Sequence, residues 1–210
     1  IEKSAQNNIT IDFIDQDAIC YASLLTNKAS TTQTIHKQAL VLKTSLQLEL
    51  AICFIKGKAK NQINYLKYLD KYHNLLDENI TKMETILQLN VKKSQNTEQL
   101  LGYEGSISAL YWEGLRIILE VPFEKRVTFG AKDIVNSSLN YGYAILYGKI
   151  QHSLVHAGLS LNISFLHALD EQKPTLVFDM IEEFRTFVVD RTIISMINKN
   201  EPISWLLGNI

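Results

Sequence analysis

The sequence contains few of the residues that interrupt helices or cross-link a chain: only three prolines and two cysteines occur among 210 residues. Scarce proline favours a helix-dominated architecture, because a proline inside a helix removes a backbone hydrogen bond and clashes with the preceding turn. Cys20 and Cys53 lie in apolar surroundings and have no companion at metal-ligand or redox-motif spacing, so we expect buried free thiols in a reduced, cytoplasmic protein.

Long hydrophobic runs and surplus positive charge are also absent. Apolar stretches such as residues 50–55 fall far short of the ~20 residues that a membrane-spanning helix needs, so we expect no contact with a membrane. The chain has 21 Lys and Arg against 22 Asp and Glu, a formal net charge of −1. It therefore lacks the overall basic character of many nucleic-acid-binding proteins, and any contact with DNA must be made by a local group of basic residues.

The first thirty residues differ in pattern from the rest. Residues 8–15 alternate apolar and polar side chains, and a second β-prone stretch covers residues 18–25, which together predict a hairpin. Two strands alone are marginally stable, and the chain opens on Ile1 without an initiator Met or a leader. We therefore interpret residues 1–30 as the end of an N-terminal β-domain, most of which is missing.

From residue 31 onward, apolar residues recur at helical spacing. The pattern predicts one or two long helices over residues 40–69, with a polar stretch at 56–62 between two apolar-periodic parts. Further helices are predicted over residues 77–89, 102–119, 135–157 and 175–197, with a polar linker at 90–97. The expected fold is mainly α: a large C-terminal helical domain over residues 31–210, preceded by a remnant of a small β-domain.

Several catalytic motifs are missing. The chain has no Gly-rich phosphate loop, no Gly-x-Ser-x-Gly elbow and no His-Asp doublet of helical phosphohydrolases. His152 and His156 share a helical face, but Ser153 stands where the zinc-protease pattern has a glutamate, so this pair gives little support for a zinc site. Most enzyme classes therefore lose support.

Acidic and histidine side chains provide the remaining candidates. Asp179 and Glu182 are three residues apart on a predicted helix, so both can reach one divalent ion, although a solvated acidic face is the ordinary alternative. His167 lies in an apolar segment, where a lone histidine more often serves the core. Glu104 lies at the expected start of a helix, where the helix dipole favours a carboxylate without any further function.

Four ordered blocks of the sequence stand out: Tyr103-Glu104-Gly105 with Tyr111-Trp112; Asp133-Ile134-Val135-Asn136 with Leu139-Asn140-Tyr141-Gly142-Tyr143; Phe165-Leu166-His167; and Phe178-Asp179-Met180-Ile181-Glu182-Glu183-Phe184-Arg185 with Val188-Val189-Asp190-Arg191. In this order they resemble the signature blocks of the CRISPR-associated integrase family. A weaker match covers residues 56–62, and residues 9–25 are similar to the end of that family's N-terminal β-domain. The sequence departs from the family pattern at Ile134, Ser164 and Thr186.

The resemblance implies a catalytic metal site with Glu104, His167 and Glu182 as ligands. Asp179 becomes an auxiliary acid near the metal, and we expect its loss to be milder than that of a ligand. Oxygen ligands with one imidazole suit Mg²⁺ or Mn²⁺. Arg185 is a candidate both for DNA binding and for a salt bridge to Glu182. The full set of expected DNA-binding residues is Lys56, Lys58, Lys60, Lys125, Arg126 and Arg185.

The implied activity is that of a metal-dependent DNA integrase and endonuclease, which inserts short DNA fragments into a CRISPR array by attack of a 3′ hydroxyl on a phosphodiester. The implied partners are prespacer DNA, the CRISPR repeat, a second copy of the chain and a small ferredoxin-like CRISPR-associated adaptation protein. Some members of the family also carry a fused or associated reverse transcriptase. Two alternatives stay open: a transposon-borne integrase of the same fold, and a non-catalytic helical scaffold that binds DNA or a partner.

Overall fold

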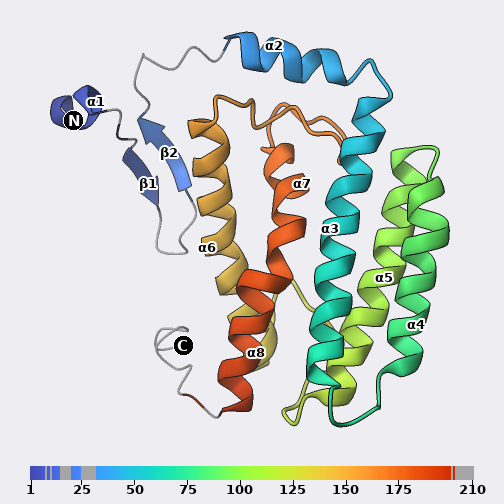
Figure 1. Ribbon diagram of the computed structural model, residues 1–210. Helices are drawn as coiled ribbons and strands as arrows, with labels where there is room; N and C mark the ends of the chain where they lie inside the picture. The colour runs from blue at the N-terminus through green and yellow to red at the C-terminus, as the bar shows by residue number, and fades with distance from the viewer. Residues whose placement is uncertain (8, 10, 15–19, 25–31, 200, 202–210) are drawn as a thin grey trace.

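The computed structural model describes residues 1–7, 9, 11–14, 20–24, 32–199 and 201. A short helix, α1 (Glu2–Gln6), and an antiparallel hairpin of β1 (Ile11–Ile14) and β2 (Cys20–Leu24) come first along the chain (Figure 1). The two strands pair in antiparallel orientation, with Ile11 opposite Leu24, so the hairpin that the alternating pattern predicted is present. That residues 1–30 belong to a larger β-domain stays a prediction.

The remaining helices form a bundle around α3 (Leu46–Leu69). One side of α3 packs against α5 (Thr97–Ile118) and α4 (Asp77–Thr85), and the other side packs against α7 (Thr175–Phe184) (Figure 1). Helix α6 (Ile134–His156) covers α7, while α2 (Thr32–Val41) lies across one end of the bundle in Figure 1. The mainly helical fold class that we expected is confirmed.

Helix α3 runs without a break through its polar stretch. Its buried positions Ala51, Ile55, Ala59, Ile63 and Leu66 recur every three or four residues, so one apolar stripe continues past residues 56–62. Removing each large apolar side chain of this stripe from water stabilises the fold by about 1.5–3 kcal/mol. The central helix therefore holds the elements on both of its sides in fixed positions.

Two helix boundaries differ from the prediction in ways that affect the site. Helix α5 begins at Thr97 instead of residue 102, and the side chain of Asn96 caps it by accepting a hydrogen bond of 2.9 Å from the backbone N–H of Gln99. Glu104 consequently lies inside the helix, and the helix dipole at an N-terminus does not explain it. This corrects our expectation for Glu104.

The predicted helix over residues 175–197 is divided in the structure. The π-helical segment η3 (Arg185–Asp190) joins α7 to α8 (Arg191–Asn198). A second π-helical segment, η1 (Ile86–Asn90), and a 3₁₀ turn, η2 (Val91–Lys93), follow α4. The wide turns of a π-helix are rare and often occur at functional sites.

Two smaller observations concern the cysteines and the length of the helices. Cys53 is exposed, so our expectation of a buried thiol is wrong at this position. In the part of the chain that the structure describes, no single helix is long and apolar enough to cross a membrane. Helices α2 and α3 meet the criteria of length and composition only as a pair, and they are bent by 92° at the break between them.

Candidate metal centre

A buried lysine joins two of the expected metal ligands. The ammonium group of Lys58, on α3, forms ion pairs with Glu104 Oε1 on α5 and with Glu182 Oε2 on α7, the latter at 2.5 Å. The exposed fractions of the three side chains are 10%, 20% and 9%. Because α5 and α7 both pack against α3, residues separated by more than a hundred positions in sequence meet at one point.

Each carboxylate has a further partner of its own. The hydroxyl of Ser108, one turn along α5, donates a hydrogen bond of 2.8 Å to Glu104 Oε1. Arg185 Nη1 lies 3.0 Å from Glu182 Oε1. Burial acts to raise the pKa of Glu182, but the positive charges of Lys58 and Arg185 outweigh it, and the pKa lies below its ordinary value. Glu182 is therefore held as a carboxylate.

Asp179 has a different environment from Glu182. It is fully buried, and its Oδ2 accepts hydrogen bonds from the backbone N–H groups of Phe165 and Leu166 at 2.6 and 2.9 Å. Its Oδ1 accepts one from the backbone N–H of His167 at 3.1 Å and lies 2.7 Å from that residue's Nδ1. This carboxylate fixes the loop before α7. Because Nδ1 of His167 contacts Asp179, Nε2 is the ring nitrogen that can bind a metal ion.

The expected ligands lie in one region of the fold, but their side chains are not close enough together to bind one metal ion. His167 is close enough to Glu182 to lower the pKa of this carboxyl, after the larger effects of burial, Lys58 and Arg185. Among the described residues, however, no three His, Cys, Asp or Glu side chains are arranged so that they could hold a metal ion. The ammonium of Lys58 stands between Glu104 and Glu182, where a shared cation would be placed.

The donor types nevertheless fit a divalent ion. Two carboxylates and one imidazole are suitable ligands for Mg²⁺ and Mn²⁺. The Oε2 atom of Glu182 is buried and has no hydrogen bond, so its contact with Lys58 is an ion pair without hydrogen-bond geometry. Asp179, by contrast, uses both oxygens within the protein, and we assign it to positioning His167 instead of to metal ligation.

The basic residues do not form one common surface. Successive helix positions are rotated by ~100°, so Lys56 and Lys60 share a face of α3 while Lys58 lies on the other side. Lys60 is exposed and Lys56 half-buried, whereas only 8% of Lys58 is exposed. The three lysines that we named as DNA-binding candidates thus do not lie on one face of α3, and which of them contact DNA stays a prediction. Lys125 is exposed in the loop before α6.

Two arginines are instead part of the internal structure. Arg126 donates hydrogen bonds to the side-chain oxygens of Asn136 and Asn140, and its guanidinium lies 5.3 Å from the ring centre of Tyr143. Burial lowers the pKa of Arg126 from its ordinary value. Arg185 pairs with Glu182, which agrees with the salt-bridge role that we considered for it.

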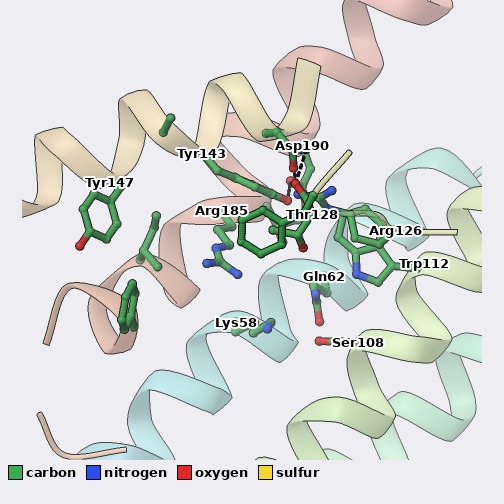
Figure 2. A pocket seen from close by; sticks show the side chains of 16 residues that line it. Lys58, Gln62, Ser108, Trp112, Arg126, Thr128, Tyr143, Tyr147, Arg185 and Asp190 are labelled. Atoms are coloured by element: carbon green, nitrogen blue, oxygen red, sulfur yellow. Dashed lines mark hydrogen bonds between the residues drawn. The ribbon is translucent and has the colours of Figure 1, made fainter. Parts of the chain in front are cut away.

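A cavity of about 580 Å³ opens beside Lys58 between α3, α5, α6 and α7. Figure 2 shows Lys58, Gln62, Arg126, Arg185 and Tyr143 among the residues that line it. Sequence reasoning selected neither the cavity nor Asp190, a buried carboxyl in its lining. The only available signal was that Asp190 lies in the last of the four resembling blocks.

Asp190 is held by two tyrosines. The hydroxyl of Tyr111 donates a hydrogen bond of 2.8 Å to Asp190 Oδ2, and that of Tyr143 donates one to Oδ1. Burial raises the pKa of Asp190, although both hydrogen bonds and Arg185 oppose the rise. Because the three residues come from α5, α6 and η3, the hydrogen bonds connect these elements beside the cavity.

Comparison with known proteins identifies the family of the chain. Residues 1–203 match the family described as CRISPR associated protein Cas1. The chain is 33% identical to the CRISPR-associated endonuclease Cas1 1 of Francisella tularensis subsp. novicida over 93% of its length, and it covers 63% of that protein. It thus spans less than two thirds of this relative.

Two solved structures share the fold. One is a partial Cas6-RT-Cas1–Cas2 complex, with a TM-score of 0.78 and 21% identity over 96% of this chain and 61% of that chain. The other is a casposase bound to an integration product, with a TM-score of 0.75 and 24% identity over 96% of this chain and 60% of that chain. The family match extends over nearly the whole sequence, and the chain belongs to the CRISPR-associated Cas1 family.

Proposed function

We propose that this chain is the helical catalytic part of a metal-dependent DNA integrase and endonuclease, which inserts short DNA fragments into a CRISPR array. The observation that carries the proposal is the convergence of Glu104 and Glu182 on one cation. Two carboxylates from separate helices, one buried and one partly buried, meet at one point in the region of an oriented histidine. Membership of the Cas1 family supports the same activity.

In this proposal Glu104, Glu182 and the Nε2 of His167 would hold a Mg²⁺ or Mn²⁺ ion. The bound ion would supply the polarisation of a phosphoryl oxygen and the stabilisation of a leaving oxygen that phosphodiester transfer requires. Asp179 holds the His167 ring through Nδ1, and Arg185 holds Glu182 in its ionised form. These two residues keep the ligands in place before substrate arrives.

DNA would be held by exposed basic side chains outside the metal centre. Lys60 is exposed on α3 and Lys125 in the loop before α6, so both can neutralise phosphates without reading base sequence. With a formal net charge of −1, the chain has no general excess of positive charge to replace them. Lys58, Arg126 and Arg185 are already paired inside the protein.

The test is a strand-transfer assay with the full-length protein that contains this chain, a DNA duplex with free 3′ hydroxyls and a plasmid carrying a CRISPR repeat. Glu104→Gln and Glu182→Gln should each abolish transfer, because each replaces a negatively charged ligand of the ion by a neutral amide. The matched control is Glu98→Gln, at an exposed position on the same helix as Glu104, which should keep transfer. Transfer by the Glu104→Gln variant at the rate of the control would contradict the proposal.

The same assay separates the alternatives. A transposon-borne integrase would insert into an unrelated element end as readily as into the repeat, and a DNA-binding scaffold would show no transfer with any metal. A homodimer, a small ferredoxin-like adaptation protein, and a fused or associated reverse transcriptase remain proposed partners on the strength of the family. We also propose a cytoplasmic location, where the DNA substrates would be found.

A further inference from the structure

Lys58 occupies an unusual position for a lysine. Its ammonium is buried between the two carboxylates that the proposed function assigns to the metal. A buried ammonium is tolerated only when it is paired, and here one positive charge serves two negative ones. The site therefore already contains a cation of its own.

The carboxylates do not depend on Lys58 alone for their orientation. Ser108 donates to Glu104 at 2.8 Å, and Arg185 pairs with Glu182 at 3.0 Å. Both partners lie one turn from the carboxylate that they hold, on the same continuous stretch of helix. Withdrawal of Lys58 would thus leave each ligand with a fixed neighbour.

The balance of charge opposes a metal ion and Lys58 in the same place. The two carboxylates, Lys58 and Arg185 together carry no net charge. A divalent ion added to this group would bring two further positive charges into a largely buried position and would place the ion against the ammonium. The lysine must therefore move away when the metal enters.

The structure provides a place for the displaced ammonium. Gln62 lies one turn after Lys58 on α3, and both line the cavity of about 580 Å³ (Figure 2). Gln62 is 2% exposed, and its Oε1 atom is buried with no hydrogen-bond donor among the described residues. A buried acceptor without a donor is costly, and a lysine one helical turn away can supply the donor.

We propose that Lys58 competes with the divalent ion, bridging Glu104 and Glu182 in the metal-free protein and moving to Gln62 Oε1 when the ion binds. This inference rests on the proposed metal site and adds a step to its loading. Lys58 is a positioning residue that prevents the two carboxylates from repelling each other before the metal arrives. Gln62 lowers the cost of moving it.

The first experiment measures Mn²⁺ affinity by calorimetry for the wild type, Lys58→Met, Gln62→Leu and the double variant. Without its competitor, Lys58→Met should bind Mn²⁺ about tenfold more tightly, equivalent to ~1.4 kcal/mol. Gln62→Leu should weaken binding when Lys58 is present and should have no effect in the Lys58→Met background. Unchanged or weaker binding by Lys58→Met, or an equal effect of Gln62→Leu in both backgrounds, would overturn the proposal.

A second measurement needs no substitution at Lys58. Acetic anhydride should acetylate Lys58 of the wild type faster in saturating Mn²⁺ than in its absence, as read by peptide mass spectrometry, because the ammonium has left its ion pairs. Lys60, exposed on the same helix, is the internal control and should react equally in both conditions. Equal protection of Lys58 with and without Mn²⁺ would refute its displacement.

Glu104→Gln separates this inference from the proposed function. If Glu104→Gln binds Mn²⁺ as the wild type does, the metal site itself is wrong. If Glu104→Gln loses the ion while Lys58→Met gains no affinity, the metal site stands and the competition by Lys58 is wrong.

Discussion

Replacing Asp179 by asparagine should destabilise the protein more than any substitution of a proposed metal ligand. The carboxylate is fully buried and accepts four contacts, three from backbone N–H groups and one from the His167 ring. Asparagine has the same shape, but its NH₂ group must face one pair of donors. Two hydrogen bonds to a charged acceptor are then lost, at about 1.5–3 kcal/mol each, so we expect a loss of about 3–6 kcal/mol.

Urea unfolding gives the free energy directly, and the comparison variant is Glu182→Gln, which leaves the loop before α7 untouched. We expect Asp179→Asn also to lose strand transfer at temperatures where it is still folded, because His167 is no longer oriented. A loss of stability below ~1 kcal/mol together with normal transfer would refute the role that we assign to the carboxylate. This expectation reverses the milder effect that the sequence suggested.

Three further predictions follow from packing, charge and titration. Gly142→Ala should lower the free energy of unfolding by about 1–3 kcal/mol, because the new Cβ would lie 2.6 Å from a methyl carbon of Val189 in η3. Gly102→Ala has nothing within 4 Å of its Cβ and should be neutral or stabilising. Thermal melts measure both effects. Replacing Lys56 and Lys60 by glutamine should reduce the salt dependence of duplex binding, and an unchanged slope would remove this face of α3 from the DNA interface. The pKa of the Glu182 carboxyl is lowered on folding, so this group stabilises the folded protein at pH values above its unfolded pKa of about 4.5. That stabilisation should be lost as the pH falls below about 4.5. The free energy of unfolding of Glu182→Gln should therefore depend less on pH in the acidic range than that of the wild type.

The fold class could be predicted from the sequence because the spacing of apolar residues shows which side chains face the core. Alternation predicted the hairpin, and recurrence every three or four residues predicted each long helix after residue 40. The π-helical segment η3 could not be predicted, since a wide turn depends on packing with neighbouring helices instead of on local sequence. The division of the last long helix at residues 185–190 therefore differs from expectation.

The candidate site was predictable only where a motif resembled a family. Glu104, His167 and Glu182 do come to one region of the fold, but their role as ligands stays a prediction. Spacing placed Asp179 and Glu182 on one face of a helix, yet only the position of the preceding loop shows that Asp179 serves the backbone. Lys58 was grouped with its neighbours in a polar stretch, because charge pattern alone does not report that one of three lysines is buried.

The four side chains of the candidate centre come from α3, α5, α7 and the loop before α7, so the unfolded chain has no local segment that reproduces the site. A divalent ion should therefore act as a ligand of the native state alone. At a free concentration of 100 times the dissociation constant, such an ion raises the free energy of unfolding by ~2.7 kcal/mol. The melting temperature of the helical bundle is thus expected to report the occupancy of the centre, and chelators should lower it without touching any other part of the molecule.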